Sequence, residues 1–328
     1  MTANQIVIRE AIEADGPALA EIERRTALQL GDAELVIDRG NDYFAAARLM
    51  GDATVLMAEM DGQPVGVFCA APHRALIGGV ERRMLYIHHA RILPGAQNKG
   101  LGKLFGDQLR EKFAGQTDSN YFYISPGNLQ SQAFARRAQN RWSVQPTLID
   151  LAVARDNAEP GVVRAATPAD AERIVALLNS AHSGEEMYLP YSAASFSARM
   201  ARAPGLYSWD QVWLTGRAVI GVWPEGESIT VRVTPEEGPA VESRGAAVLD
   251  FGYEQGAESE LLGLLKAWGG WLDERGMSSL SLFSSPGARH WELLRRLGEI
   301  RPFDFWTPAI PEPENVADRG VYVDHIYF

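Results

Sequence analysis

The segment from residue 97 to residue 103 has the residue types and the spacing needed to hold a phosphate group. It reads Gln97-Asn98-Lys99-Gly100-Leu101-Gly102-Lys103 and follows a β-prone run over residues 85–93 and a turn at Pro94-Gly95. Apolar residues at helical spacing then predict an amphipathic helix: Leu101, Leu104, Phe105 and Leu109. The first N–H groups of a helix lack partners within it, and the helix dipole places partial positive charge there. Because glycine also lets the backbone approach a ligand closely, the segment is a candidate pyrophosphate site.

Two common nucleotide motifs do not fit this segment. A Walker loop requires Ser or Thr after its Gly-Lys pair, but Leu104 follows Gly102-Lys103. The dinucleotide fingerprint requires a third glycine where this sequence has Phe105. The segment therefore belongs to another class of phosphate loop, unless it is a plain glycine-containing helix start.

A strand that ends in apolar-x-Pro and is followed by [R/Q]xxGx[G/A] resembles the GNAT superfamily of N-acetyltransferases. The run from Ile92 through Pro94, Gln97 and Gly100 to Gly102 matches that motif in order and spacing. The order of the surrounding elements also agrees over roughly residues 5–153. The resemblance implies a mixed α/β fold and acetyl-CoA as co-substrate, with no metal ion.

The resemblance assigns cofactor contacts residue by residue. In this family the turn, here Gln97 to Lys103, holds the pyrophosphate of coenzyme A. The strand before it splays and offers backbone groups to the pantetheine arm and the acyl carbonyl, a stretch occupied here by Ala90, Arg91 and Ile92. The asparagine that contacts the cofactor after the next strand matches Asn128.

Two positions depart from the family pattern. A tyrosine that often protonates the leaving thiolate is Ala135 here, and a glutamate that some members carry is Tyr123. The usual acid is therefore missing.

Acetyl transfer to an amine needs a neutral nucleophile, a polarised thioester carbonyl and a proton for the departing thiolate. Strand alternation places two sets of residues on opposite faces, with Tyr86, His88 and Ala90 on one and Ile87, His89 and Arg91 on the other. Aromatic-amine acetyltransferases of this superfamily often carry histidines at positions that look like Tyr86 and His88. We take His88 as the candidate base and Tyr123 or Tyr86 as the candidate acid. The alternative is that these residues only line a cleft.

The chain repeats itself in three places. Residues 6–15 are echoed at 162–170, and Arg9 and Asp15 correspond to Arg164 and Asp170. A predicted hairpin with an Asp61-Gly62 turn has a counterpart at residues 212–223. The run 122–127 is echoed at 282–287. These echoes predict two tandem GNAT-like domains, each a mostly antiparallel twisted sheet flanked by helices, at residues 1–155 and 160–328.

The second domain lacks the phosphate loop. The corresponding segment, residues 255–262, has no Gly-x-Gly pair and places Glu258 and Glu260 where phosphates would bind. Ala288 replaces the asparagine. We expect a degenerate copy that binds no coenzyme A. The terminal run 321–328 alternates like a closing strand.

Composition and charge exclude several classes of protein and of binding partner. The chain has 328 residues, 46% of them hydrophobic, and a formal charge of −11, so it is globular and unsuited to nucleic acid or anionic membranes. Cys69 reads as a core thiol, and His73, His182, His290 and His325 lack metal-ligand spacing. No secretion signal or long apolar run is present, which predicts a soluble cytoplasmic protein.

Together these features predict an acetyl-CoA-dependent N-acetyltransferase that acts on a primary amine of a small molecule or peptide. The alternative is a non-catalytic acyl-CoA-binding sensor, which the missing acid at Ala135 favours.

Overall fold

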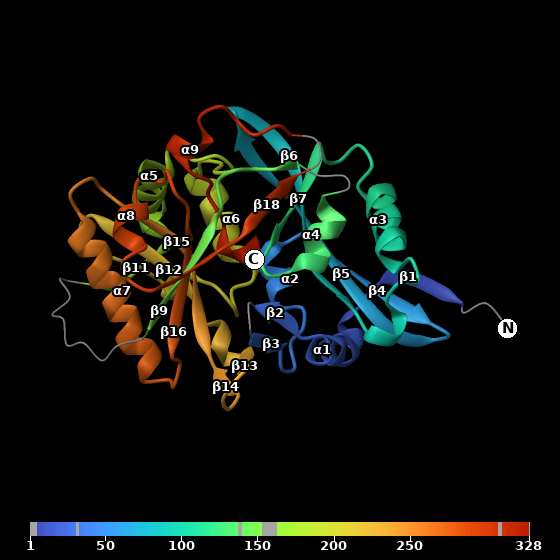
Figure 1. Ribbon diagram of the computed structural model, residues 1–328. Helices are drawn as coiled ribbons and strands as arrows, with labels where there is room; N and C mark the ends of the chain where they lie inside the picture. The colour runs from blue at the N-terminus through green and yellow to red at the C-terminus, as the bar shows by residue number, and fades with distance from the viewer. Residues whose placement is uncertain (1–4, 31–32, 137–139, 153–162, 308–309, 328) are drawn as a thin grey trace.

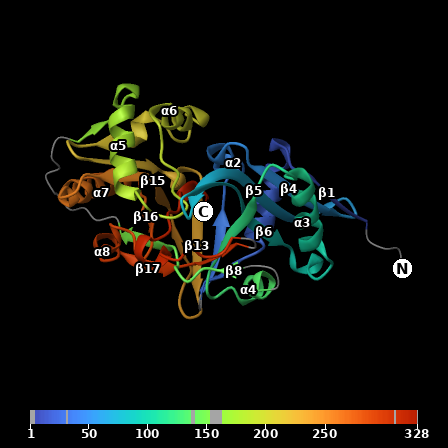
Figure 2. The same ribbon diagram turned by 90° about the horizontal axis from the view of Figure 1, so that it is seen from above.

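The computed structural model describes residues 5–30, 33–136, 140–152, 163–307 and 310–327. It holds two large mixed sheets side by side, with the end of the chain between them (Figures 1 and 2). This confirms the predicted mixed α/β fold with two sheet bodies. Within the described ranges, no helix is long and apolar enough to span a membrane.

The first sheet has seven strands, which are antiparallel except for the β6–β7 pair. In spatial order they are β1 (Ile6–Glu10), β4 (Thr54–Met60), β5 (Gln63–Ile77), β6 (Val80–Ile92), β7 (Ser119–Ile124), β18 (Asp304–Thr307) and β8 (Asn140–Arg141).

The second sheet repeats this plan, with one parallel pair, β15–β16. Its spatial order is β10 (Arg164–Ala165), β11 (Val212–Leu214), β12 (Ala218–Trp223), β15 (Gly245–Tyr253), β16 (Ser279–Ser284), β9 (Thr147–Ala152) and β17 (Glu299–Pro302).

Two strands cross between the halves of the chain. β9 precedes residue 155 but pairs with β16 and β17 of the second sheet, and β18 comes from the C-terminal half but lies between β7 and β8. The division into domains at residues 1–155 and 160–328 therefore stays a prediction. The topology adds that each half contributes one strand to the large sheet of the other half. The predicted linker, residues 154–161, lies outside the described residues.

A smaller third sheet also joins the halves. β3 (Ala33–Asp38) pairs with β2 (Leu28–Leu30) on one side and with β13 (Thr230–Pro235) on the other, and β14 (Val241–Ser243) completes the order. The sequence repeats gave no sign of this sheet.

Helices cover both faces of each large sheet. The described helices are α1 (Gly16–Arg24), α2 (Ala45–Met50), α3 (Leu101–Lys112), α4 (Leu129–Ala135), α5 (Ala171–His182), α6 (Ala193–Arg202), α7 (Glu258–Asp273), α8 (Trp291–Leu294) and α9 (Val316–Arg319). On β4, Val55 and Met57 pack toward α1, and Leu56 and Ala58 pack toward α3. Because successive side chains of a strand point to opposite faces, one strand serves two helical layers.

The sequence echoes reappear as matching local structures. Arg9 pairs with Asp15 at 2.7 Å, and Arg164 pairs with Asp170 at 2.5 Å. Asp61 and Gly62 both have positive φ, as the tight hairpin turn between β4 and β5 requires. The predicted closing strand at residues 321–328 is wrong, because Val321 forms only an isolated bridge to Glu186 and a 3₁₀ turn follows at His325–Tyr327.

We predict that Phe305→Ala lowers the free energy of unfolding by about 3–5 kcal/mol. Phe305 is fully buried on β18 and packs on Tyr121 and Trp142 with ring centroids 5.4 and 4.6 Å away, so truncation leaves a cavity where the exchanged strand meets its host sheet. Ile300→Ala on exposed β17 is the control, with an expected change within about 1 kcal/mol. Denaturant unfolding measures both, and equal effects would contradict the prediction.

Candidate functional site

The parallel pair at the centre of the first sheet separates after a short contact. Met84 to Tyr86 of β6 pair with Ser119 to Tyr121 of β7. Beyond this stretch β6 continues to Ile92 and β7 to Ile124, while the other edge of β7 pairs with β18. The backbone edge of β6 is thus free of β7 along the part that the sequence assigns to the pantetheine arm, and Ala90 there is exposed.

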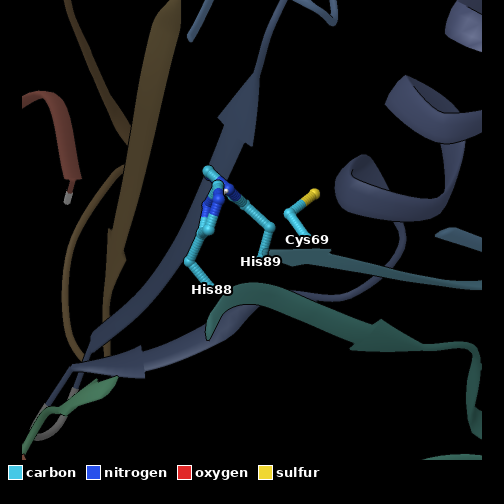
Figure 3. Close-up of side chains that lie close together, drawn as sticks. All are labelled: Cys69, His88 and His89. Carbon is cyan, nitrogen blue, oxygen red and sulfur yellow. Dashed lines mark hydrogen bonds between the residues drawn. The ribbon is translucent and has the colours of Figure 1, made fainter. Parts of the chain in front are cut away.

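A β-bulge at His89 brings the side chains of His88 and His89 into contact. Cys69 is paired with His88 and Val67 with Arg91, so β6 has one residue more than β5 over this stretch, and His89 has a φ of +49°. The extra residue interrupts the alternation that would place His88 and His89 on opposite faces. Their Nδ1 atoms instead lie in hydrogen-bond contact, beside Cys69 (Figure 3).

The predicted phosphate loop forms a left-handed turn into α3. Asn98 and Gly100 have φ values of +61° and +81°, and Gly100 is the N-cap residue, with no side chain capping the helix. A Cβ built on Gly100 or Gly102 would meet no atom within 4 Å. The loop therefore presents uncapped first-turn N–H groups to open space, as an anion site requires.

The polar side chains of the loop are held by local contacts. The Lys103 ammonium lies 2.5 Å from Asp107, the Lys99 ammonium lies 3.3 Å from Met60 Sδ, and the Gln97 amide donates to the Ile92 carbonyl. Asn128 Oδ1 accepts from the Ser131 N–H at 3.0 Å, which caps α4. Asn128 thus has a structural role in addition to the one that the resemblance implies.

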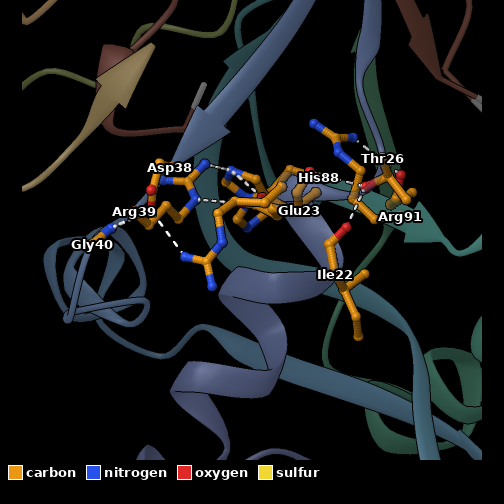
Figure 4. Close-up of polar contacts among 11 residues, drawn as sticks. Ile22, Glu23, Thr26, Asp38, Arg39, Gly40, His88 and Arg91 are labelled. Carbon is orange, nitrogen blue, oxygen red and sulfur yellow. Dashed lines mark hydrogen bonds and ion pairs between the residues drawn. The ribbon is translucent and has the colours of Figure 1, made fainter. Parts of the chain in front are cut away.

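A buried polar chain lies behind the bulge (Figure 4). Glu23 of α1 accepts from Arg39 Nε at 2.7 Å, and Arg39 Nη2 contacts His89 Nε2. His89 in turn contacts His88. Glu23 Oε1 and His88 Nε2 are buried without a hydrogen-bond partner.

This chain fixes the protons on both imidazoles. Arginine can only donate, so His89 Nε2 is an acceptor and its Nδ1 carries the hydrogen. His88 Nδ1 then accepts, and His88 Nε2 carries a hydrogen of its own. Burial, followed by the charges of Arg39 and Arg91, lowers the pKa of His88 to about 3, so the ring is neutral. His88 therefore offers a hydrogen-bond donor, and the candidate base of the sequence analysis is better placed to polarise a carbonyl.

Stacked tyrosines connect His88 to a cleft between the two sheets. Tyr86 is stacked on His88 at 4.8 Å and lies 5.1 Å from Tyr121 and 5.8 Å from Tyr123. Burial raises the pKa of Tyr86 and of Tyr123, so both keep their protons. Tyr121 and Tyr123 line a hollow of about 200 Å³, which shares His73 and Tyr327 with a neighbouring hollow of about 560 Å³.

The opposite wall of the cleft comes from the C-terminal half of the chain. Asp324 accepts both arms of Arg199, at 2.7 and 2.9 Å, and Arg199 Nε donates to Asp250 at 3.2 Å. Tyr191 and Arg202 also line it. These residues were not predicted from the sequence, in which His73 is an unremarkable histidine. Their aromatic and charged character within residues 187–202 and 321–327 was the available signal, but nothing local showed that these runs meet.

The corresponding helix of the second domain, α7, carries acidic residues in its first turn. Glu260 there accepts from Thr215 Oγ1 at 2.6 Å and from the Arg217 N–H at 2.8 Å, both in the turn between β11 and β12. No side chain caps α7, but its first turn carries carboxylates where the first turn of α3 has no acidic residue.

A splayed parallel pair followed by a glycine turn and an uncapped helix N-terminus defines a class of fold that binds a phosphorylated ligand along one strand. Residues 18–139 match the model of the acetyltransferase (GNAT) family. This part of the chain is a GNAT domain. No curated protein sequence matches the chain.

Solved structures share the fold over nearly the whole chain. The structure of Saccharomyces cerevisiae N-myristoyltransferase with bound myristoyl-CoA has a TM-score of 0.66 at 9% identity, covering 95% of this chain and 86% of its own. A second structure of that enzyme gives 0.68 at 8% identity, covering 94% and 80%. A GCN5-related N-acetyltransferase from Kribbella flavida gives 0.51 at 14% identity, covering 92% and 71%. These likenesses show the tandem fold.

We predict that Gly102→Glu abolishes coenzyme A binding and that the wild type binds one coenzyme A per chain. Gly102 has open space and ordinary φ, so the variant adds a charge facing the pyrophosphate without straining the backbone. Gly100→Glu is the less suitable variant, because Gly100 has the left-handed φ that side chains rarely adopt.

Gly263→Glu is the matched control, because Gly263 also has open space but lies on α7. Calorimetric titration should give wild-type affinity for Gly263→Glu. A stoichiometry near two per chain, or unchanged affinity in Gly102→Glu, would contradict the assignment.

Proposed function

We propose that this protein transfers an acyl group, acetyl in the first instance, from acyl-CoA to a primary amine of a small molecule or peptide. The observation that carries the proposal is the open glycine loop at the N-terminus of α3, placed directly after the free edge of β6. Backbone N–H groups of the loop receive the pyrophosphate, and the edge at Ala90, Arg91 and Ile92 receives the pantetheine arm. This direction brings the thioester toward the bulge at His89.

The acceptor amine enters from the cleft between the two sheets. Its walls come from both halves of the chain, which explains why a domain without a phosphate loop is kept. Asp324 supplies a carboxylate near the tyrosines, and Arg74 and Arg202 supply positive charge. A molecule that carries both an amine and an anionic group fits such a lining.

The chemical step needs few groups once both substrates are placed. The neutral amine attacks the thioester carbonyl carbon, the C–S bond breaks, the amine nitrogen loses a proton and the thiolate gains one. His88 Nε2–H polarises the carbonyl as a neutral imidazole. Tyr86 and Tyr123 keep their protons and are the candidate donors to the thiolate.

The proposal includes acyl donors of different chain length. The likeness to an enzyme solved with myristoyl-CoA favours testing long donors beside acetyl-CoA. A sensor that binds acyl-CoA without turnover is the rival function, because Ala135 stands where an acid is expected.

We predict release of free thiol from acyl-CoA in the presence of a suitable amine. The assay uses donors from acetyl- to myristoyl-CoA against amino acids, polyamines, aminoglycosides and peptides, with Gly102→Glu as the inactive control. Turnover on any amine rejects the sensor. Tight binding by calorimetry with no turnover across the whole panel would reject the transferase.

We predict that His88→Ala lowers kcat by about 10²–10³-fold, because one hydrogen bond to the developing oxyanion is lost. The KM for acyl-CoA should change little. His88→Asn keeps an N–H donor and should recover part of the rate with no shift of the pH profile. If His88 is instead the base, the asparagine variant is as slow as alanine and the acidic limb of the profile disappears.

A further inference from the structure

The second domain contains a buried cluster that the function above does not use. His182 ends α5, Glu185 follows in the next loop, and His290 lies 105 residues after Glu185, just before α8. Their exposed fractions are 2%, 7% and 1%. One ligand atom from each lies within 4.8 Å of the others. Sequence spacing predicted no metal site at these histidines, because their proximity is created by the fold.

The protons on His182 do not satisfy its contacts in the neutral state. Its Nε2 lies 2.9 Å from the carbonyl oxygen of Phe251, which can only accept, so Nε2 carries a hydrogen. Nδ1 of the neutral ring is then an acceptor, yet it faces Glu185 Oε1 at 3.0 Å. Two acceptors at this distance repel one another unless a proton or a metal ion lies between them.

The Nδ1 atom of His290 lies near the same carboxylate oxygen. Its Nδ1 is buried without a hydrogen-bond partner and lies 3.8 Å from the same Glu185 oxygen. The neighbouring Arg289 does not form an ion pair with the Glu185 carboxylate, because its guanidinium donates to the carbonyls of Ser180 and Tyr253.

We propose that His182 Nδ1, Glu185 Oε1 and His290 Nδ1 bind a divalent transition-metal ion, with Zn²⁺ the best match to two imidazoles and one carboxylate. Ligands about 2.1 Å from a tetrahedral zinc ion lie about 3.4 Å apart. The two separations from Glu185 are 3.0 and 3.8 Å, on either side of that value. The hydrogen bond from His182 to Phe251 is the outer contact that orients a metal-binding imidazole.

The site lies where the second parallel pair separates. β15 and β16 pair only from Gly245 to Ala247 and from Ser279 to Ser281, and Phe251 lies further along β15. An ion here connects α5 with the loop that follows β16. It would therefore stabilise the copy of the fold that has no coenzyme A to fill this position.

The other histidine cluster of the chain is unsuited to a cation. Arg39 directs its guanidinium at His89, and burial raises the pKa of Cys69 to about 12, which keeps the thiol protonated. Cys69→Ala is therefore the matched control for a metal at His182, Glu185 and His290.

The test uses the untagged full-length chain, stripped with 1,10-phenanthroline and titrated with Zn²⁺. We expect one zinc per chain by elemental analysis, and a rise in Tm of about 4 °C at free Zn²⁺ near a hundred times Kd. Glu185→Gln and His290→Asn should each weaken binding by on the order of a hundredfold or more. Cys69→Ala should bind as the wild type does.

Two results would overturn the proposal. A stripped wild-type protein with no zinc uptake and no shift in Tm would show that these three side chains bind no zinc. Zinc binding that survives Glu185→Gln but is lost in Cys69→Ala would place the ion at the other cluster. Because the wild-type protein alone decides the first result, a variant that fails to fold leaves the proposal testable.

Discussion

The separation of β6 from β7 is the constraint on which the rest of the first domain depends. A sheet normally continues its ladder as far as both strands reach, because unpaired backbone groups are costly when buried. Here β7 satisfies its other edge through β18, and the bulge at His89 turns β6 away after Tyr86. The exchanged strand and the bulge together keep open an edge that a ligand's amides can complete.

The two halves have the same arrangement of elements but different residues at the start of the helix that follows the parallel pair. Both have a parallel pair, a turn and a helix that starts beside it. In the first half, Gly100 and Gly102 leave the helix N-terminus bare; in the second, the first turn of α7 carries Glu260, which accepts from Thr215 and Arg217. A carboxylate in the first turn of a helix interacts favourably with the helix dipole but repels a phosphate that would bind beside it.

Local patterns in the sequence were sufficient to predict individual turns, strands and helices. They were not sufficient to predict which elements contact one another in the fold. The Asp61-Gly62 turn, the loop into α3 and the repeated Arg–Asp pairs depend on neighbouring residues, and a short run specifies each. β18 is four residues long and joins a strand about 180 positions earlier, so no local pattern marks its partner. The cleft shares this limitation, because Asp324 and Tyr327 lie in a run that alternates like a strand but ends in a 3₁₀ turn.

The bulge at His89 is the most consequential feature that periodicity could not supply. One extra residue reverses the face of every side chain beyond it, so an alternation argument that is sound up to His88 fails at the next position. The same extra residue brings the imidazoles of His88 and His89 into contact. Because Arg39 donates to His89, the hydrogen bonds run from Arg39 through His89 to His88 and leave an N–H donor on His88. The second histidine pair, His182 and His290, faces the carboxylate of Glu185 and not a guanidinium. In our two proposals, the charge of this third partner is what distinguishes a histidine that polarises a carbonyl from a histidine pair that binds a cation.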